Sequence, residues 1–304
     1  MLKEFLPKKS LVIIELAKYM LEKKQGDRIA PIDYFVSKHN WTRGTVQNAF
    51  SYLKEIEAIS IVRQGCKGSF IKKMDYKKLF ECTGIDRILG AMPLPYSTTY
   101  EGLATGLYEA GRNHSLPITL IYMRGAKARL DMLLQEKCDF IIMSQIAAQA
   151  AIEMDYHIKV VHVFEEKSYT QNPHVLLLAD KNKKKLEDGM LLGYDALSLD
   201  LKVLTNALAK GVNVQYIDMM YHQLIKAVTE GKIDAAIWNA DEIIEKKLDI
   251  NYIPLPKNIG MQTSKAVIAV LEGKSMGNIL SQYDMDLIMQ TQKEVVEGHR
   301  LPAY

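Results

Sequence analysis

The stretch at residues 42–53 constrains the chain most, because its apolar and polar residues separate onto two faces of one helix. The apolar positions follow the three-to-four spacing of a buried face: Val46, Ala49, Phe50 and Leu53. The other face offers donors and acceptors suited to base edges and phosphates: Arg43, Gln47, Asn48 and Ser51. Thr42 is a suitable N-cap. This pattern is typical of the recognition helix of a helix-turn-helix domain, although a solvated amphipathic helix explains the stretch alone equally well.

Charge divides the chain near residue 78. Residues 1–78 carry 16 lysines and arginines against 8 acidic residues, a net charge of +8, whereas the remainder has a net charge of −5. A basic front on an acidic body fits a nucleic-acid-binding head joined to a domain with another task. Chance clustering of surface lysines is the alternative.

A predicted hairpin follows the helix. Residues 59–63 and 69–72 alternate as short strands around a basic, glycine-bearing turn at 65–68. With the helices expected at residues 11–24 and 32–38, this hairpin completes a winged helix-turn-helix. Arg63 and Lys67 would let the wing contact phosphates, which adds salt-dependent affinity without sequence information.

These motifs, taken in order, resemble the DNA-binding domain of GntR-type bacterial repressors over roughly residues 8–73. The run Thr42-Arg43-Gly44-Thr45-Val46 is similar to the Ser-Arg-x-Thr-Val start of that family's recognition helix. The run GCKGSFI at 65–71 is similar to its Gly-x-Gly-Thr-Phe-Val wing, with one more residue between the glycines. The resemblance implies that Arg43 and Thr45 contact DNA and that the wing tip near Lys67 approaches the minor groove.

The sequence pattern changes after residue 75, where we expect the DNA-binding domain of residues 1–75 to end. From residue 79 onward, apolar runs alternate with amphipathic helices, which predicts α/β structure with a mostly parallel sheet. Two passages are alike: QEKCDFIIMS at 135–144 and TEGKIDAAIWN at 229–239 each enter a strand through Asp and end it on a small polar residue. We therefore expect two similar lobes.

The expected boundaries follow from this repeat. The first lobe takes residues 79–167 and 257–304, and the second takes residues 168–256. Residues 160–166 and 251–255 are the expected crossings between the lobes. A single helix at 277–298 is expected to pack back on the first lobe.

Two α/β lobes joined by two crossings resemble the type II periplasmic-binding-protein fold, which effector domains of LysR-type regulators also use. This resemblance covers about residues 79–304 and rests on the order of elements. The complete layout resembles the YhfZ-type family of regulators. The expected fold is therefore an α+β winged helix-turn-helix head followed by an α/β two-lobed domain of periplasmic-binding-protein type.

Ligands of open α/β lobes bind beyond the carboxyl ends of the strands. On this rule the candidate ligand-binding residues are Tyr96, Ser97, Thr98, Arg124, Ser144, Gln145, Tyr194, Ser198, Asp218 and Asn239. Hydroxyls and backbone N–H groups at helix starts suit a carboxylate or phosphate, and Arg124 would add a charge-assisted contact, so an anionic metabolite is one candidate effector. One observation argues against an anion here. Glu101, which completes a capping box in the helix expected to begin at Thr98, places a negative charge in the first turn of that helix. For any single position, an ordinary cap or loop residue explains the pattern as well.

Motifs for catalysis and metal binding are sparse. The seven histidines are scattered, the three cysteines lack metal-type spacing, and no phosphate-loop motif occurs. We expect no catalytic residues, no metal and no cofactor. Asp218 and His222, one helical turn apart, are the acid–base pair that a transferase or deaminase on this fold would offer. The glycines of GLATG at 102–106 lie inside a predicted helix and favour close packing.

These observations favour a transcription regulator without enzyme activity. Its head would bind operator DNA as a homodimer while its lobes close on a small metabolite. The sequence contains no run of about 18 apolar residues, so we expect no membrane span. The first ten residues lack the apolar core of a signal peptide, and three cysteines without a disulfide pattern suit the cytoplasm. Two alternatives remain: an enzyme with an accessory basic head, and a binding protein whose head contacts proteins. Turnover would identify the first, and loss of affinity for duplex DNA with added salt would count against the second.

Overall fold

The computed structural model describes residues 7–114, 116–256, 259, 263–274 and 276–304. The chain forms two compact units, one of residues 1–88, 114–117 and 273–283, the other of residues 89–113, 118–272 and 284–304. Within the described residues, no helix is both long and apolar enough to cross a membrane.

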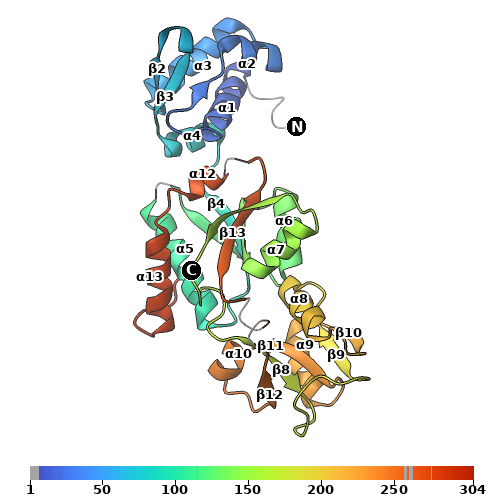
Figure 1. The fold of residues 1–304 in the computed structure, drawn as a ribbon. Helices are drawn as coiled ribbons and strands as arrows, with labels where there is room; N and C mark the ends of the chain where they lie inside the picture. Colours follow the sequence, from blue (N-terminus) through green and yellow to red (C-terminus); the bar gives the residue numbers. More distant parts are fainter. Residues whose placement is uncertain (1–6, 115, 257–258, 260–262, 275) are drawn as a thin grey trace. The chain divides into compact units, whose positions relative to one another are not determined.

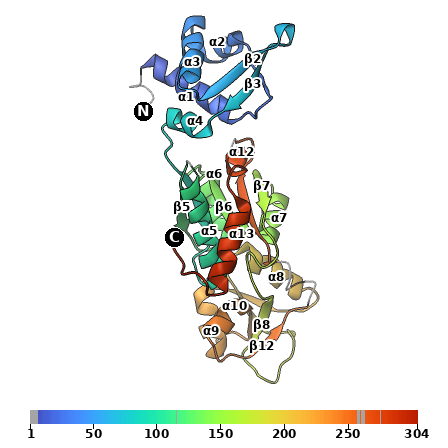
Figure 2. The same ribbon diagram turned by 90° about the vertical axis from the view of Figure 1, so that its left-hand side faces the viewer.

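The N-terminal head is a winged helix-turn-helix domain (Figures 1 and 2). Its helices are α1 (Lys8–Leu21), α2 (Ile32–His39), α3 (Arg43–Glu55) and α4 (Tyr76–Thr83). Its strands are β1 (Arg28–Ile29), β2 (Ile59–Arg63) and β3 (Ser69–Met74), in the antiparallel order β1-β3-β2. The short β1 was not predicted, since two residues carry no periodicity.

Helix α3 confirms the helix predicted at residues 42–53. Thr42 caps it, because its Oγ1 accepts a hydrogen bond from the Thr45 N–H at 3.3 Å. The buried residues of α3 are the predicted ones: Val46, Ala49, Phe50 and Leu53. Asn40 adopts the left-handed conformation at φ 53°, which ends α2 and permits the tight turn into α3.

The first lobe of the C-terminal domain is built on a five-stranded sheet in the order β5-β4-β6-β13-β7. The strands are β4 (Ile88–Met92), β5 (Ile118–Tyr122), β6 (Phe140–Ser144), β7 (Ile158–Val163) and β13 (Ala266–Leu271). The helices are α5 (Thr98–Asn113), α6 (Ala126–Leu134), α7 (Gln145–Glu153) and α13 (Met285–Val296). The apolar core of this lobe packs around the central strand β6, whose residues are all buried.

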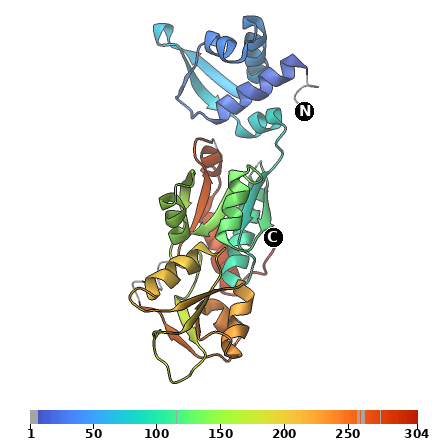
Figure 3. The same ribbon diagram turned by 90° about the vertical axis from the view of Figure 1, so that its right-hand side faces the viewer.

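The second lobe, drawn in yellow to orange in Figure 3, repeats this plan. Its strand order is β10-β9-β11-β8-β12. The strands are β8 (His174–Leu178), β9 (Leu191–Tyr194), β10 (Gln215–Asp218), β11 (Ala235–Asn239) and β12 (Tyr252–Pro254). The helices are α8 (Leu199–Leu208), α9 (Tyr221–Thr229) and α10 (Ala240–Glu245). This lobe has its own apolar core, centred on β8 and β11.

The two passages singled out as a repeat form the central strands β6 and β11. Asp139 accepts the Leu89 N–H at 2.8 Å at the start of β6, and Asp234 accepts the Leu191 N–H at 2.7 Å at the start of β11. Each carboxylate thereby ties its central strand to the parallel neighbour in the sheet, β4 for β6 and β9 for β11. At the other end, Ser144 caps α7 and Asn239 caps α10. The prediction of two similar lobes is confirmed down to these hydrogen bonds.

Two expectations about the lobes are wrong. The sheets are mixed rather than mostly parallel, because β8 and β13 each enter after a crossing from the other lobe and run antiparallel to β11 and β6. The expected crossings are largely edge strands: β7 pairs with β13, and β12 pairs with β8. Part of the expected return at 251–255 is therefore sheet, and residues 257–258 and 260–262 lie outside the described residues.

The helix expected at 277–298 is interrupted. It consists of α12 (Met276–Leu280) and α13, because Asp284 caps a new helix by accepting the Leu287 N–H at 2.9 Å. The predicted capping box at Thr98 is also wrong: the Tyr100 N–H points to Ser97 Oγ at 3.5 Å, so Ser97 takes the cap position of α5.

Helix α13 packs along α5, and two glycines allow this close approach. A Cβ atom on Gly106 would lie 2.5 Å from the backbone oxygen of Ile288, and one on Gly102 would lie 2.8 Å from that of Gln292. The packing role predicted for these glycines is confirmed.

Candidate functional site

The outer face of α3 presents the polar side chains predicted to read DNA. Arg43, Gln47, Asn48 and Ser51 are exposed. Arg43 Nη1 lies 2.9 Å from Asp33 Oδ1 on α2, and the two side chains are 63% and 69% exposed. An ion pair this exposed contributes little free energy, so the Arg43 guanidinium remains available for a partner.

Thr42 and Thr45 serve the start of α3. Their hydroxyl oxygens are 2.7 Å apart, and Thr42 also accepts from the Thr45 backbone. Both side chains are thus tied to the cap in the described state, while the free N–H groups of the first turn would still suit a phosphate.

The wing turn accommodates its extra residue through a short 3₁₀ turn at Gly65–Lys67. Gly65 and Gly68 adopt positive φ values of 53° and 98°, which glycine tolerates best. The predicted contacts Arg63 and Lys67 are both exposed on this wing. Their role in contacting phosphates stays a prediction.

Arg28 is a basic residue of this face that sequence reasoning missed. It lies exposed on β1, opposite Phe70 in the antiparallel register with β3. Its Nε would be 3.0 Å from a Cβ on Gly68, so its guanidinium borders the wing turn. The position becomes evident only once β1 is known to pair with β3.

A cavity of about 80 Å³ lies between the two lobes, where the carboxyl ends of β4, β5, β9 and β11 meet. Five of the predicted ligand-binding residues line it: Tyr96, Ser97, Arg124, Ser198 and Asn239. Ser198 and Asn239 also cap helices, by accepting from the N–H groups of Leu201 and Asp241. The expectation that a ligand site lies beyond the carboxyl ends of the strands therefore led to this cavity.

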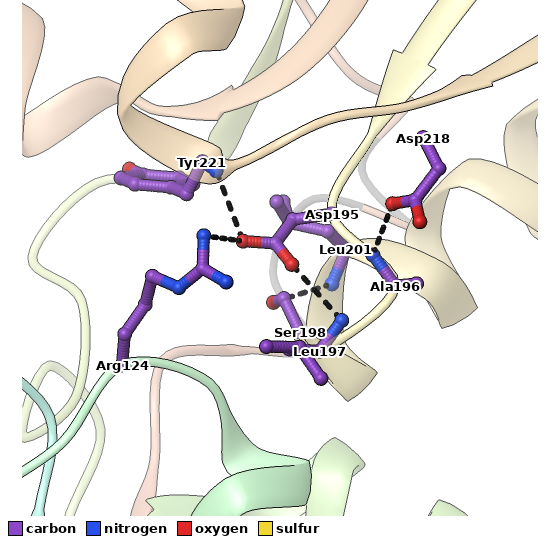
Figure 4. A network of polar contacts seen from close by, with 8 residues as sticks. All are labelled: Arg124, Asp195, Ala196, Leu197, Ser198, Leu201, Asp218 and Tyr221. Carbon is purple, nitrogen blue, oxygen red and sulfur yellow. Dashed lines mark hydrogen bonds and ion pairs between the residues drawn. The ribbon is translucent and has the colours of Figure 1, made fainter.

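Arg124 of the first lobe faces Asp195 of the second (Figure 4). Its Nη1 is 3.2 Å from Asp195 Oδ2, and the side chains are 25% and 4% exposed. The same nitrogen is buried without a hydrogen bond of good geometry, so the contact is an ion pair rather than a directed hydrogen bond. Asp195 also accepts the backbone N–H groups of Tyr221 and Leu197, each at 2.9 Å.

Further contacts join the lobes beside the cavity. Glu245 of α10 accepts the Thr98 N–H with both carboxylate oxygens at 3.2 Å and the Thr98 hydroxyl at 2.7 Å. The Ser144 hydroxyl donates to the buried carboxylate of Asp200. Thr98 and Ser144, predicted to bind a ligand, thus contact the opposite lobe instead of lining the cavity.

The remaining predicted residues lie away from the cavity wall. Gln145 is exposed, and the ring of Tyr194 packs on that of Tyr216 with centroids 5.8 Å apart. Asp218 accepts the Ala196 N–H at 3.1 Å, so it braces the loop that carries Asp195 (Figure 4). His222 is exposed and does not line the cavity either, so the pair that an enzyme would offer is not assembled there.

Aromatic and acidic side chains complete the cavity wall, and sequence reasoning missed them. They are Tyr100, Tyr169, Asp195, Asp200, Tyr221 and Glu242. Burial raises the pKa of Asp200, while its hydrogen bond from Ser144 opposes that shift. Asp195 directly follows the predicted Tyr194, so the search for polar residues at strand ends missed it by one position.

Arg129 and His174 of the cavity wall both have partners within the protein. Buried Arg129 donates to the carbonyl oxygens of Ile142 and Met123, at 3.0 and 2.8 Å. His174 is buried beside Thr263, and burial lowers its pKa to about 4, so its ring is neutral at neutral pH.

Comparisons with known proteins agree with this architecture. Residues 75–304 match the family described as the YhfZ C-terminal domain, and residues 24–71 match a helix-turn-helix domain family. Across the full length of both chains, the sequence is 29% identical to a protein of Escherichia coli K12 named "Uncharacterized protein YhfZ". The GntR-type kinship of the head stays a prediction, because the match is to a helix-turn-helix family of another description.

Solved structures are similar as well. The crystal structure of YhfZ from Shigella flexneri aligns with a TM-score of 0.62 and 28% identity, covering 75% of this chain and 97% of that one. The periplasmic aliphatic sulphonate binding protein SsuA of Escherichia coli aligns with a TM-score of 0.53 and 13% identity, covering 70% of this chain and 75% of that one. The second likeness concerns the fold alone. The predicted fold, a helix-turn-helix head before a two-lobed α/β domain, is confirmed.

Proposed function

The chain belongs to the YhfZ family, and we propose that it is a DNA-binding transcription regulator whose operator affinity responds to a small metabolite held between its lobes. The observation that carries this proposal is the exposed, polar outer face of α3 on a helix-turn-helix head. The cavity at the strand ends supports the second half, since this is where open α/β lobes bind ligands.

In the proposed mechanism, α3 enters the major groove and the wing contacts the flanking backbone. Arg43 reads a base edge, while Arg28, Arg63 and Lys67 neutralise phosphates. One head covers only a short half-site, so we propose that a homodimer reads two half-sites in the cytoplasm. A ligand alters DNA binding only if it prefers one state of the lobes over another.

Replacing Arg43 by alanine is expected to weaken binding to selected operator fragments by about 1–3 kcal/mol and to relax base preference at one position. The reason is loss of a charged donor from the exposed first turn of α3, the part of a recognition helix that contacts base edges. Genomic duplex fragments retained by the purified protein at physiological salt would be sequenced, and the affinity of enriched sites measured for both proteins.

Lys226→Ala is the matched control, because this exposed lysine lies on α9 in the second lobe and pairs with Glu230. It removes the same charge without touching the head. Equal retention of fragments by wild type, Arg43→Ala and Lys226→Ala would contradict sequence reading by α3. Enrichment of no fragment at all would count against the regulator itself.

Replacing Arg28 by alanine is expected to have a different signature. A phosphate contact carries no sequence information, so affinity should fall about equally for specific and unrelated duplexes. The slope of log affinity against log salt should decrease by about 1. Titrations of one operator and one scrambled duplex at several salt concentrations test this, and an unchanged salt slope would exclude Arg28 from the interface.

A further inference from the structure

The two groups of the first lobe that best suit an anion already hold carboxylates of the second lobe. Arg124 faces Asp195 at 3.2 Å, and the start of α5 is bound by Glu245 through Thr98. Arg129, the other guanidinium of the wall, donates to two carbonyl oxygens. An anionic ligand would therefore have to displace part of the protein.

Each carboxylate of the cavity wall has a partner, but the partner of Glu242 differs from the others. Asp195 pairs with Arg124, Asp200 accepts from Ser144, and His174 is neutral. Glu242 is largely buried, whereas the ammonium group paired with it belongs to Lys246, whose side chain is half exposed. Since a buried charge needs a close partner, a cation inside the cavity can take the place of Lys246 beside Glu242.

Aromatic rings stand beside the carboxylate of Glu242. Tyr221 donates its hydroxyl to Glu242 Oε2 at 3.1 Å, and its ring stacks on the buried Trp238 with centroids 3.8 Å apart. The ring of Tyr96, from the first lobe, lies 5.9 Å from that of Tyr221. Rings held in this way can accept an ammonium group against their faces.

The electrostatic effect of Glu242 reaches both rings. Burial chiefly raises the pKa values of the Tyr96 and Tyr221 hydroxyls, and the negative charge of Glu242 is the next cause for each. Lys246 Nζ is 2.6 Å from Glu242 Oε1 and competes for the same carboxylate. Its side chain is half exposed, so water can solvate it when a ligand takes its place.

The size of the cavity limits the ligand. A water molecule needs about 10–15 Å³ of such space, so a cavity of about 80 Å³ accommodates on the order of five to eight non-hydrogen atoms. A small metabolite therefore fits the cavity as described.

We infer that the cavity binds the protonated amine of a small metabolite, with Glu242 as its counter-ion and the rings of Tyr96 and Tyr221 against the ammonium group. The inference rests on the proposed function for its regulatory meaning, since it names the class of effector. It replaces the anionic metabolite that the strand-end residues suggested.

The test compares probes that share one alkyl chain and differ in charge. Butylamine, butyrate and 1-butanol are titrated into the full chain at neutral pH in a calorimeter. Butylamine is expected to bind at least tenfold more tightly than the other two. Tighter binding of butyrate, or no difference among the three, would overturn the inference.

Two variants, one in α10 and one at its C-cap, should act in opposite directions. Glu242→Gln, which keeps the shape of the side chain, should weaken butylamine binding about tenfold or more, as expected for loss of a charge-assisted contact. Lys246→Gln removes the competing cation and should strengthen it. Circular dichroism verifies that both variants fold, and a loss of affinity in Lys246→Gln equal to that in Glu242→Gln would contradict the assignment.

Binding of the amine and binding of DNA are measured separately, so the two proposals can fail separately. If butylamine binds but operator affinity does not change with it, the amine site stands and the link to regulation fails. If DNA is bound selectively while butyrate outcompetes butylamine in the cavity, the regulator stands and the amine site fails.

Discussion

Replacement of Asp195 by alanine is expected to lower the free energy of unfolding of the two-lobed domain by roughly 2–4 kcal/mol. The carboxylate accepts two backbone N–H groups and pairs with Arg124 across the lobes. Its removal leaves these donors and a largely buried guanidinium without their acceptor. Arg124 is a quarter exposed, so water offsets part of the loss.

Trp238 offers the measurement. The chain has two tryptophans, so in a Trp41→Phe background the fluorescence of Trp238 reports the second lobe alone during urea unfolding. Asp218→Ala is the matched control, because within the described part of the chain this exposed carboxylate accepts a single backbone N–H group, that of Ala196. The control should cost about 1 kcal/mol. Equal losses in the two variants would show that Asp195 does not join the lobes.

Replacement of Gly106 by alanine is expected to destabilise the first lobe by about 1–3 kcal/mol. The added Cβ would sit 2.5 Å from the backbone oxygen and 3.0 Å from the Cα of Ile288, so α5 and α13 must separate. A backbone neighbour cannot move aside as a flexible side chain can. Thermal unfolding followed by circular dichroism measures the loss.

Gly44→Ala makes the same chemical change in α3, where a Cβ meets nothing within 4 Å. It should stabilise the head by about 0.5–1 kcal/mol, because alanine favours a helix over glycine. Trp41, next to α3, reports this variant. Stabilisation of both domains by their alanines would refute the packing role of Gly106.

The sequence by itself determined the local elements and their repetition. The three-to-four spacing of residues 42–53 defines a face of α3, because a helix must bury one side. The Asp that opens each central strand and the polar residue that ends it made the two lobes recognisable as a pair. These features depend on neighbours in the chain, so periodicity and capping reveal them.

Only the tertiary structure decided which residues contact one another at the candidate site. Arg124, Thr98 and Ser144 were predicted from their positions after strands, yet their partners Asp195, Glu245 and Asp200 come from the other lobe. The same is true of Arg28, which reaches the wing through strand pairing. Contacts between residues far apart in the chain leave no periodic signal, because nothing local requires one partner rather than another. The sequence could therefore place the cavity, while the fold decided that Arg124 and the start of α5 contact carboxylates of the other lobe and that acidic and aromatic side chains complete the wall.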